Sequence, residues 1–246
     1  MSTLEYDGSF EGFLTAIFDC YAQKKTDVRI RNACASTTTL FGTNIRVQTD
    51  TEKSNRVWEG LKKRTSKEAA RQFYCNFLSE LPDFEDHLLE YARYVFASRE
   101  DVSRDFSHPA VLRTAQVARM VGREKHRMEA FVRFQLSGEI YHASIHPDYN
   151  VLPLIGPHFK SRYADQRWFI WDEARHYGLL YDLEHLQVVH ETPEETQAGT
   201  ARTSDYARLW KTYFQSTNIT ERRNMKLHVQ HVPYRYWKYL CEKQPL

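Results

Sequence analysis

The segment from Phe131 to Glu191 constrains the fold most, because strand-like and turn-like stretches alternate along it. FVRFQL, EIYHASI, QRWFIWD, HYGLLYD and HLQVVHE are rich in β-branched and aromatic residues, which is typical of strands. Ser137 and Gly138 predict a hairpin turn between the first two strands. NVLPLIGPHFKSRY, between the second and third, predicts an irregular helix because it contains two prolines. Five strands around one helical segment favour an antiparallel sheet with helices packed on it.

The rest of the first 190 residues is mainly helical in pattern. Apolar residues from Phe10 to Tyr21 recur at helical spacing after a capping residue, Ser9. VRIRNAC and TNIRVQT are candidate strands, and a second helix is expected after Asp50. Amphipathic patterns between residues 67 and 127 predict further helices, the last of them beginning at Pro109. We therefore predict one α+β domain over residues 1–190.

The composition changes after residue 190. Residues 191–203, ETPEETQAGTART, are acidic, polar and aperiodic, which predicts an exposed linker or loop. Residues 204–246 predict a basic, aromatic, helical C-terminal segment, and residues 201–246 hold nine Lys/Arg against three Asp/Glu, a net charge of +6. Such a segment suits phosphate contacts combined with base stacking. The alternative is that its aromatic residues anchor it to the body while its charges face water.

The whole-chain composition excludes several classes of protein. The net charge of +2 is too small to indicate a nucleic-acid partner by itself. There is no apolar run of about 18 residues and no signal-peptide pattern, so we expect a cytoplasmic protein without a membrane partner. The chain has no Gly-rich phosphate loop, no G-x-S-x-G motif and no C-x-x-C pair, which argues against ATPase, α/β-hydrolase, zinc-finger and iron–sulfur proteins.

Charged and histidine side chains gather between Glu124 and Asp182, near the predicted strand ends. Three of them are arginines that predict a phosphate-binding cleft, since a guanidinium group recognises phosphate bidentately. Arg133 is expected in the first strand, Arg162 on the helix, and Arg175 just beyond the third strand.

Other readings of this stretch involve His158, Asp172 and Asp148. A His–Asp pair drawn from them would suit general acid–base catalysis. These three residues and His146 are a possible set of metal ligands, but no tight ligand spacing supports a metal site, and we expect no metal and no cofactor. A purely structural network of ion pairs is the remaining alternative.

YDGSFEGFLTAIFDCY, PDYNVL, PHFKSRY and the closing VPYRYWKYL resemble a bacterial family of unknown function, described as probable DNA metabolism or DNA repair proteins. The resemblance covers nearly the whole chain. It implies a radical-SAM protein, encoded nearby and thought to act on DNA, as a partner. It also implies a relation to a domain that is fused to some uracil-DNA glycosylases and shares the RYWK ending. The chain itself has neither the three-cysteine loop of a radical-SAM enzyme nor a glycosylase domain.

The resemblance marks a surface without assigning a catalytic role to any residue. The matching polar positions are Arg133, Asp148, Asn150, His158, Arg162, Asp172 and Arg175, followed by Arg235, Tyr236, Trp237 and Lys238 at the end of the chain. The leading expectation is a DNA repair protein that binds single-stranded or damaged DNA and acts with the radical-SAM protein. The alternatives are a nucleotide- or phosphodiester-processing enzyme and a protein–protein adaptor for that partner.

Overall fold

The computed structural model describes residues 2–23, 28–33, 43–191 and 229–243. The chain divides into two compact units, Met1–Gly122 and Arg123–Leu246, which are described separately below. Apart from Glu191, the predicted linker at 191–203 lies outside the described residues, as do residues 204–228 of the predicted C-terminal segment. The predicted domain boundaries therefore stay predictions.

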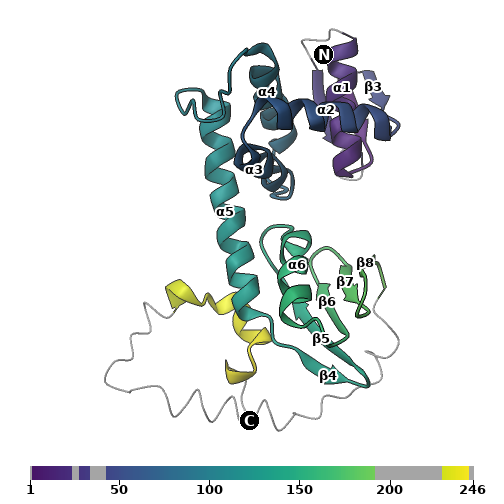
Figure 1. Cartoon of the computed structure of the whole chain (residues 1–246), viewed down its shortest axis with the longest axis vertical. Coiled ribbons are helices and arrows are strands. Elements are labelled where there is room, and N and C mark those ends of the chain that lie inside the picture. Colours follow the sequence, from purple (N-terminus) through teal and green to yellow (C-terminus); the bar gives the residue numbers. More distant parts are fainter. Residues whose placement is uncertain (1, 24–27, 34–42, 192–228, 244–246) are drawn as a thin grey trace. The chain divides into compact units, whose positions relative to one another are not determined.

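The first unit contains a three-stranded parallel sheet (Figure 1). β1 (Ser2–Tyr6) lies in the centre, between β2 (Val28–Asn32) and β3 (Thr43–Arg46). α1 (Phe10–Ala22) follows β1 and begins at the predicted cap, where the Ser9 hydroxyl accepts a hydrogen bond from the Gly12 amide at 2.9 Å. A strand, a helix and a second strand in this order return the chain to the same end of the sheet, which makes the two strands parallel.

Three more helices belong to the first unit: α2 (Thr51–Arg64), α3 (Lys67–Phe77) and α4 (Phe84–Ala97). Asp50 caps α2 as predicted, accepting hydrogen bonds from two backbone amides. The core contains many aromatic rings, and Phe13, Phe73 and Tyr91 are almost completely buried in it. Burial of these rings is the main source of stabilisation of the unit.

α5 (Pro109–Phe131) begins at the predicted proline but ends later than expected. The amide of Val132 still donates to the carbonyl of Met128 at 3.1 Å, which continues the helical pattern past the expected strand start. The prediction of a strand containing Arg133 is therefore wrong: Arg133 lies in the connection after α5, and β4 comprises only Gln135–Ser137.

The second unit contains a five-stranded sheet in the order β4-β5-β6-β7-β8. The strands after β4 are β5 (Ile140–Ile145), β6 (Trp168–Asp172), β7 (Tyr177–Tyr181) and β8 (Leu186–Val189). The predicted hairpin joins β4 to β5, and β6 to β8 form the predicted antiparallel meander.

The α+β class is confirmed, but the antiparallel sheet is only partly correct. β5 and β6 pair in parallel, so the second sheet is mixed, while the sheet of the first unit is wholly parallel. The reason is α6 (Leu152–Arg162), which connects β5 to β6 as a crossover helix. Sequence alternation shows which faces of a strand are apolar and does not show its direction.

α6 packs closely on the sheet of the second unit (Figure 1). A Cβ atom at Gly156 would lie 2.7 Å from a methyl group of Leu186 and 3.0 Å from one of Leu179, so a larger residue would require these side chains to shift. Beside it, Trp168 is 1% exposed and its ring contacts those of Phe159 and Tyr181. In the described part of the chain, no helix has the length and apolar character needed to cross a membrane.

The described part of the C-terminal segment, residues 229–243, contains two short 3-10 helices, η2 (Tyr234–Tyr239) and η3 (Cys241–Lys243). We call residues 229–243 the closing segment. Two of its side chains are buried, Tyr236 at 1% and Leu240 at 2% exposure. The ring of Tyr236 packs against that of Phe131 at the end of α5, with 5.4 Å between the centroids. The closing segment is therefore packed on the body of the second unit.

The first unit should be sensitive to acid through His87. Burial, with a smaller contribution from Arg113, lowers the pKa of His87 from 6.5 to about 4, and its Nε2 lies 3.1 Å from the Thr114 hydroxyl. A folded-state pKa below the unfolded value gives stability that is complete above pH 6.5 and is lost as the pH falls toward 4. Urea unfolding at a series of pH values should show wild type losing up to about 1 kcal/mol per pH unit more than His87→Gln. Parallel curves for the two proteins would contradict this assignment.

Candidate functional site

Some of the predicted site residues of the second unit, among them Asp148, Asp172 and Arg175, lie around the carboxyl ends of the two parallel strands. β5 ends at Ile145 and leads into the HPDYN stretch, while β6 ends at Asp172. In sheets with parallel strands and crossover helices, ligands bind in the crevice beyond these ends. The geometry there decides which predicted residues are available to a ligand.

Asp172 is completely buried at the end of β6. Its Oδ1 accepts hydrogen bonds from the amides of Ala174 at 2.9 Å and Arg175 at 3.3 Å, and its Oδ2 lies 3.1 Å from Nη1 of Arg175. Burial raises the pKa of Asp172, and the charge of Arg175 opposes that rise. This carboxylate shapes the turn after β6 and is not exposed to a ligand.

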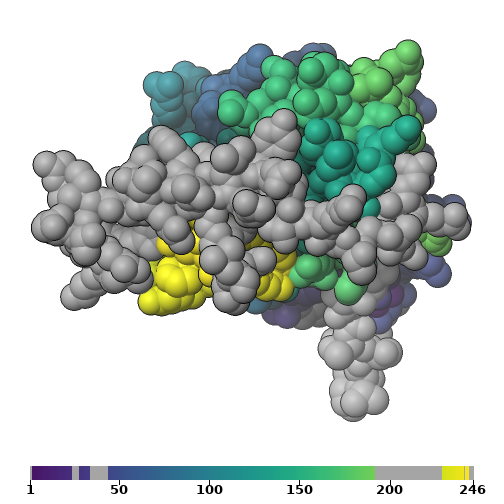
Figure 2. Space-filling model, turned by 90° about the horizontal axis from the view of Figure 1, so that it is seen from below, coloured from purple at the N-terminus to yellow at the C-terminus, as the bar shows by residue number. Residues whose placement is uncertain are grey.

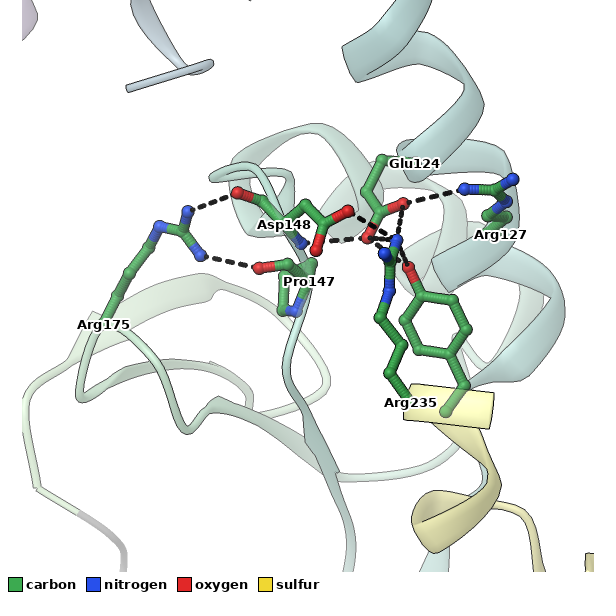
Figure 3. A network of polar contacts seen from close by, with 7 residues as sticks. Glu124, Arg127, Pro147, Asp148, Arg175 and Arg235 are labelled. Carbon is green, nitrogen blue, oxygen red and sulfur yellow. Dashed lines mark hydrogen bonds and ion pairs between the residues drawn. The ribbon is translucent and has the colours of Figure 1, made fainter. Parts of the chain in front are cut away.

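Arg175 ties the two strand ends together (Figure 3). Besides Asp172, its guanidinium donates to the carbonyl oxygens of Pro147 at 3.2 Å and Asp148 at 3.4 Å. Both carbonyls belong to the stretch after β5, so one arginine binds both strand ends. A phosphate bound by Arg175, as predicted, would have to compete with these three oxygen atoms for its guanidinium group.

Glu124 of α5 is the centre of the network, with only 1% of its side chain exposed. Its Oε1 accepts a hydrogen bond from the Asp148 amide at 3.0 Å, and its Oε2 pairs with Arg235 at 3.1 Å and Arg127 at 3.5 Å (Figure 3). The hydroxyl of Tyr236 also donates to Glu124. A buried carboxylate is tolerated only when its oxygens are paired in this way.

Arg235 extends from the closing segment between two carboxylates (Figure 3). It pairs with Glu124 on the buried side and with Oδ2 of Asp148 at 2.6 Å on the exposed side. It also donates to the hydroxyl oxygen of Tyr236. Burial opposes protonation of the guanidinium, but Tyr236, Glu124 and Asp148 outweigh it and raise the pKa of Arg235.

A second anchor of the closing segment is Glu173, the residue after Asp172. Its Oε2 accepts a hydrogen bond from the Tyr239 hydroxyl at 2.6 Å and pairs with Lys238 at 3.0 Å. Burial opposes ionisation of Glu173, yet these two donors lower its pKa. The same contact, together with burial, raises the pKa of Tyr239 to about 12. The carboxylate therefore stays charged at neutral pH.

The remaining predicted residues are not brought to this point. Arg133 donates to the carbonyls of Ala130 and Val132 and pairs with Glu242 at 3.0 Å. Nδ1 of His158 lies 3.8 Å from Glu129, and no described ion pair joins His158 to Asp172. Arg162 is exposed on α6, with its guanidinium 5.8 Å from the ring centroid of Tyr163. The predicted arginine cleft is thus dispersed, and two of its three arginines are engaged internally.

The acidic and histidine residues of the described chain do not gather into a metal site. No three His, Cys, Asp or Glu side chains in these parts of the chain lie close enough together to hold an ion. His146, Asp148, His158 and Asp172 therefore do not form a metal site in the part of the chain that the structure describes.

The sequence interpretation missed Glu124 and Glu173. A signal for Glu124 was present, because it continues the apolar stripe formed by Val117, Val121 and Met128 at three- and four-residue spacings. A carboxylate on an apolar stripe needs a partner. Glu173 carried no such signal, since its partners lie more than sixty residues away in sequence.

The closing segment also has an outer side. Tyr234 is 60% exposed, and its ring centroid lies 4.4 Å from that of Trp237. Nζ of Lys243 lies 4.8 Å from the Trp237 ring centroid, and Lys238 is 61% exposed. Figure 2 shows atoms of the closing segment, in yellow, at the molecular surface. One side of the segment therefore anchors it, while the other presents aromatic rings and positive charge.

The chain belongs to the family of a domain of unknown function, DUF4130, whose model matches residues 82–242. The matched region begins in the first unit, includes all five strands of the second sheet and extends into the closing segment. No curated protein and no solved structure matches the chain significantly.

Glu124→Gln should destabilise the second unit by about 2–4 kcal/mol, because it leaves Arg127, Arg235 and Tyr236 around an uncharged group. Urea unfolding followed by tryptophan fluorescence measures the loss. The matched control is Glu139→Gln: the Glu139 side chain is 89% exposed and lies 4.0 Å from Arg167. Its loss should cost less than about 0.5 kcal/mol. Equal effects of the two variants would contradict the central role of Glu124.

Proposed function

We propose that this protein acts in DNA metabolism or repair by binding single-stranded or damaged DNA through the outer side of its closing segment. The observation that carries the proposal is the pair of neighbouring rings formed by the exposed Tyr234 and the partly buried Trp237, with Lys238 and Lys243 in the same segment. An exposed ring can stack on a base of any sequence, and nearby cations contact the phosphates on either side. The family resemblance of the sequence supports DNA as the nucleic acid.

The inner side of the closing segment supports this proposal by fixing the rings in place. The buried carboxylate of Glu124 holds the segment through Arg235 and Tyr236. Stacking on a preorganised ring costs less conformational entropy than stacking on a ring in a free chain. Arg235 and Tyr236, expected to contact DNA directly, therefore act mainly as anchors.

Exposed cations elsewhere in the second unit extend the same proposal. Arg123 on α5 and Arg162 on α6 are exposed and have no acidic partner among the described residues. Each is able to contact a phosphate without first breaking an ion pair. The enzyme alternative has weaker support, because Asp172 is buried against Arg175 and is not paired with His158.

The proposal includes the radical-SAM protein as the partner that carries out the chemistry. It rests on the resemblance of the PDYNVL, PHFKSRY and VPYRYWKYL motifs to the family described above. In this arrangement the present chain holds the DNA strand. In the adaptor alternative it binds the same partner protein but does not contact DNA. Binding of DNA by the purified chain alone separates the two.

Fluorescence anisotropy with a labelled single-stranded oligonucleotide tests the DNA-binding surface. Tyr234→Ala and Trp237→Ala should each weaken binding by about 5- to 100-fold, the range for loss of one stacked base. Binding should also weaken steeply with added salt. Because Trp237 is partly buried, Tyr234→Ala is the more decisive variant.

The matched control is Phe106→Ala, which removes another exposed ring, 51% exposed, from the first unit. It should leave the affinity within about 2-fold, since it lacks the neighbouring cations of the closing segment. Equal losses in Phe106→Ala and Tyr234→Ala, or no measurable binding by wild type, would refute the proposed surface.

A further inference from the structure

The cations of the closing segment that anchor it face two different kinds of carboxylate. Arg235 pairs with Glu124, which is 1% exposed, and with Asp148, which is 47% exposed. Lys238 pairs with Glu173, which is 39% exposed. A buried partner is needed to hold the segment, whereas exposed ion pairs contribute little to stability. Stability therefore does not account for the pairing of Asp148 with Arg235 and of Glu173 with Lys238.

Asp148 is not required to hold Arg235 in place. The guanidinium also contacts Glu124 and Tyr236, and 40% of the Arg235 side chain is exposed. Asp148 occupies the exposed side, at 2.6 Å. A phosphate oxygen is bound by arginine with the same geometry as a carboxylate oxygen. Asp148 thus stands where a phosphate of a bound strand would bind.

Glu173 has the same relation to Lys238. The Lys238 side chain is 61% exposed, and its Nζ lies 3.0 Å from the carboxylate. The Tyr239 hydroxyl donates to the same oxygen. Because this donor is neutral, it can also donate to the uncharged amide oxygen of a glutamine at position 173. Arg235 and Lys238 therefore each carry an acidic partner that repels a phosphate and competes with it.

We propose that Asp148 and Glu173 are internal competitors of the nucleic-acid phosphates, which hold Arg235 and Lys238 when no strand is bound and limit the affinity when one is. This inference rests on the proposed DNA-binding function and adds a regulation of the same surface. A bound strand must displace both carboxylates before its phosphates can pair with Arg235 and Lys238, which lowers the net gain in affinity from these two contacts.

Removing these charges with isosteric amides should strengthen binding, which is the opposite of the usual effect of a substitution in a binding surface. Asp148→Asn and Glu173→Gln should each raise the affinity for a labelled single-stranded oligonucleotide by about 2- to 5-fold, the range for an exposed ion pair. The double variant should exceed either single variant.

Glu124 gives the contrasting result on the same arginine. Glu124→Gln should weaken binding, because the segment loses its buried anchor and the rings lose their fixed position. Tyr236→Phe is the milder variant, since it removes only the hydroxyl that donates to Glu124, and it should weaken binding in the same direction. The thermal midpoint of each variant shows whether it is folded at the assay temperature.

Glu139→Gln is the control for net charge, because it also removes one exposed negative charge from the second unit. It should change the affinity by less than about 2-fold. An equal gain in Glu139→Gln and Asp148→Asn would overturn the competitor role, as would unchanged or weaker binding by Asp148→Asn and Glu173→Gln. If Tyr234-dependent binding persists in those cases, only this inference fails. If wild type does not bind the oligonucleotide, the proposed function fails with it.

Discussion

The second unit depends on one buried carboxylate, that of Glu124. It accepts a backbone hydrogen bond from the stretch after β5 and pairs with Arg235 of the closing segment. Without these partners its charge would be buried unpaired, which costs several kcal/mol. The helix, the strand end and the closing segment therefore adopt their positions together.

The network gives opposite tasks to neighbouring residues of one short motif. In RYWK, Arg235 and Tyr236 point toward Glu124, whereas the preceding Tyr234 is exposed beside Trp237. A tight helix of about three residues per turn puts residues 234 and 237 on one side and leaves residue 236 on another. The two readings of this segment, as an anchor and as a binding surface, are therefore compatible.

Much of the fold was predictable because its signals are local. Ser9 and Asp50 cap helices by hydrogen bonds within three residues, and Pro109 marks the start of α5. The parallel pairing of β5 with β6 was missed, since strand direction depends on the crossover by α6 and not on alternation. Arg133 was assigned to a strand because FVRFQL alternates, although backbone bonding continues the helix to Val132.

The site was harder to predict than the fold, since its contacts join residues far apart in sequence. Arg175 and Asp172 were expected near strand ends and do lie there, but they bind each other and the Pro147 carbonyl. Arg235, one of the partners of Glu124, is 111 residues away, beyond the range of any local pattern. Charged residues on helices are ordinarily solvated, so only the apolar spacing around Glu124 distinguished it.

That separation has a consequence for synthesis of the chain. Glu124, Asp148 and Glu173 are made well before Arg235, Lys238 and Tyr239, so the nascent second unit has its acids without their cations. Contacts between distant residues also form slowly, because a long loop must close first. The sheet can assemble earlier, but the network of ion pairs is complete only when residues 235–239 have been translated.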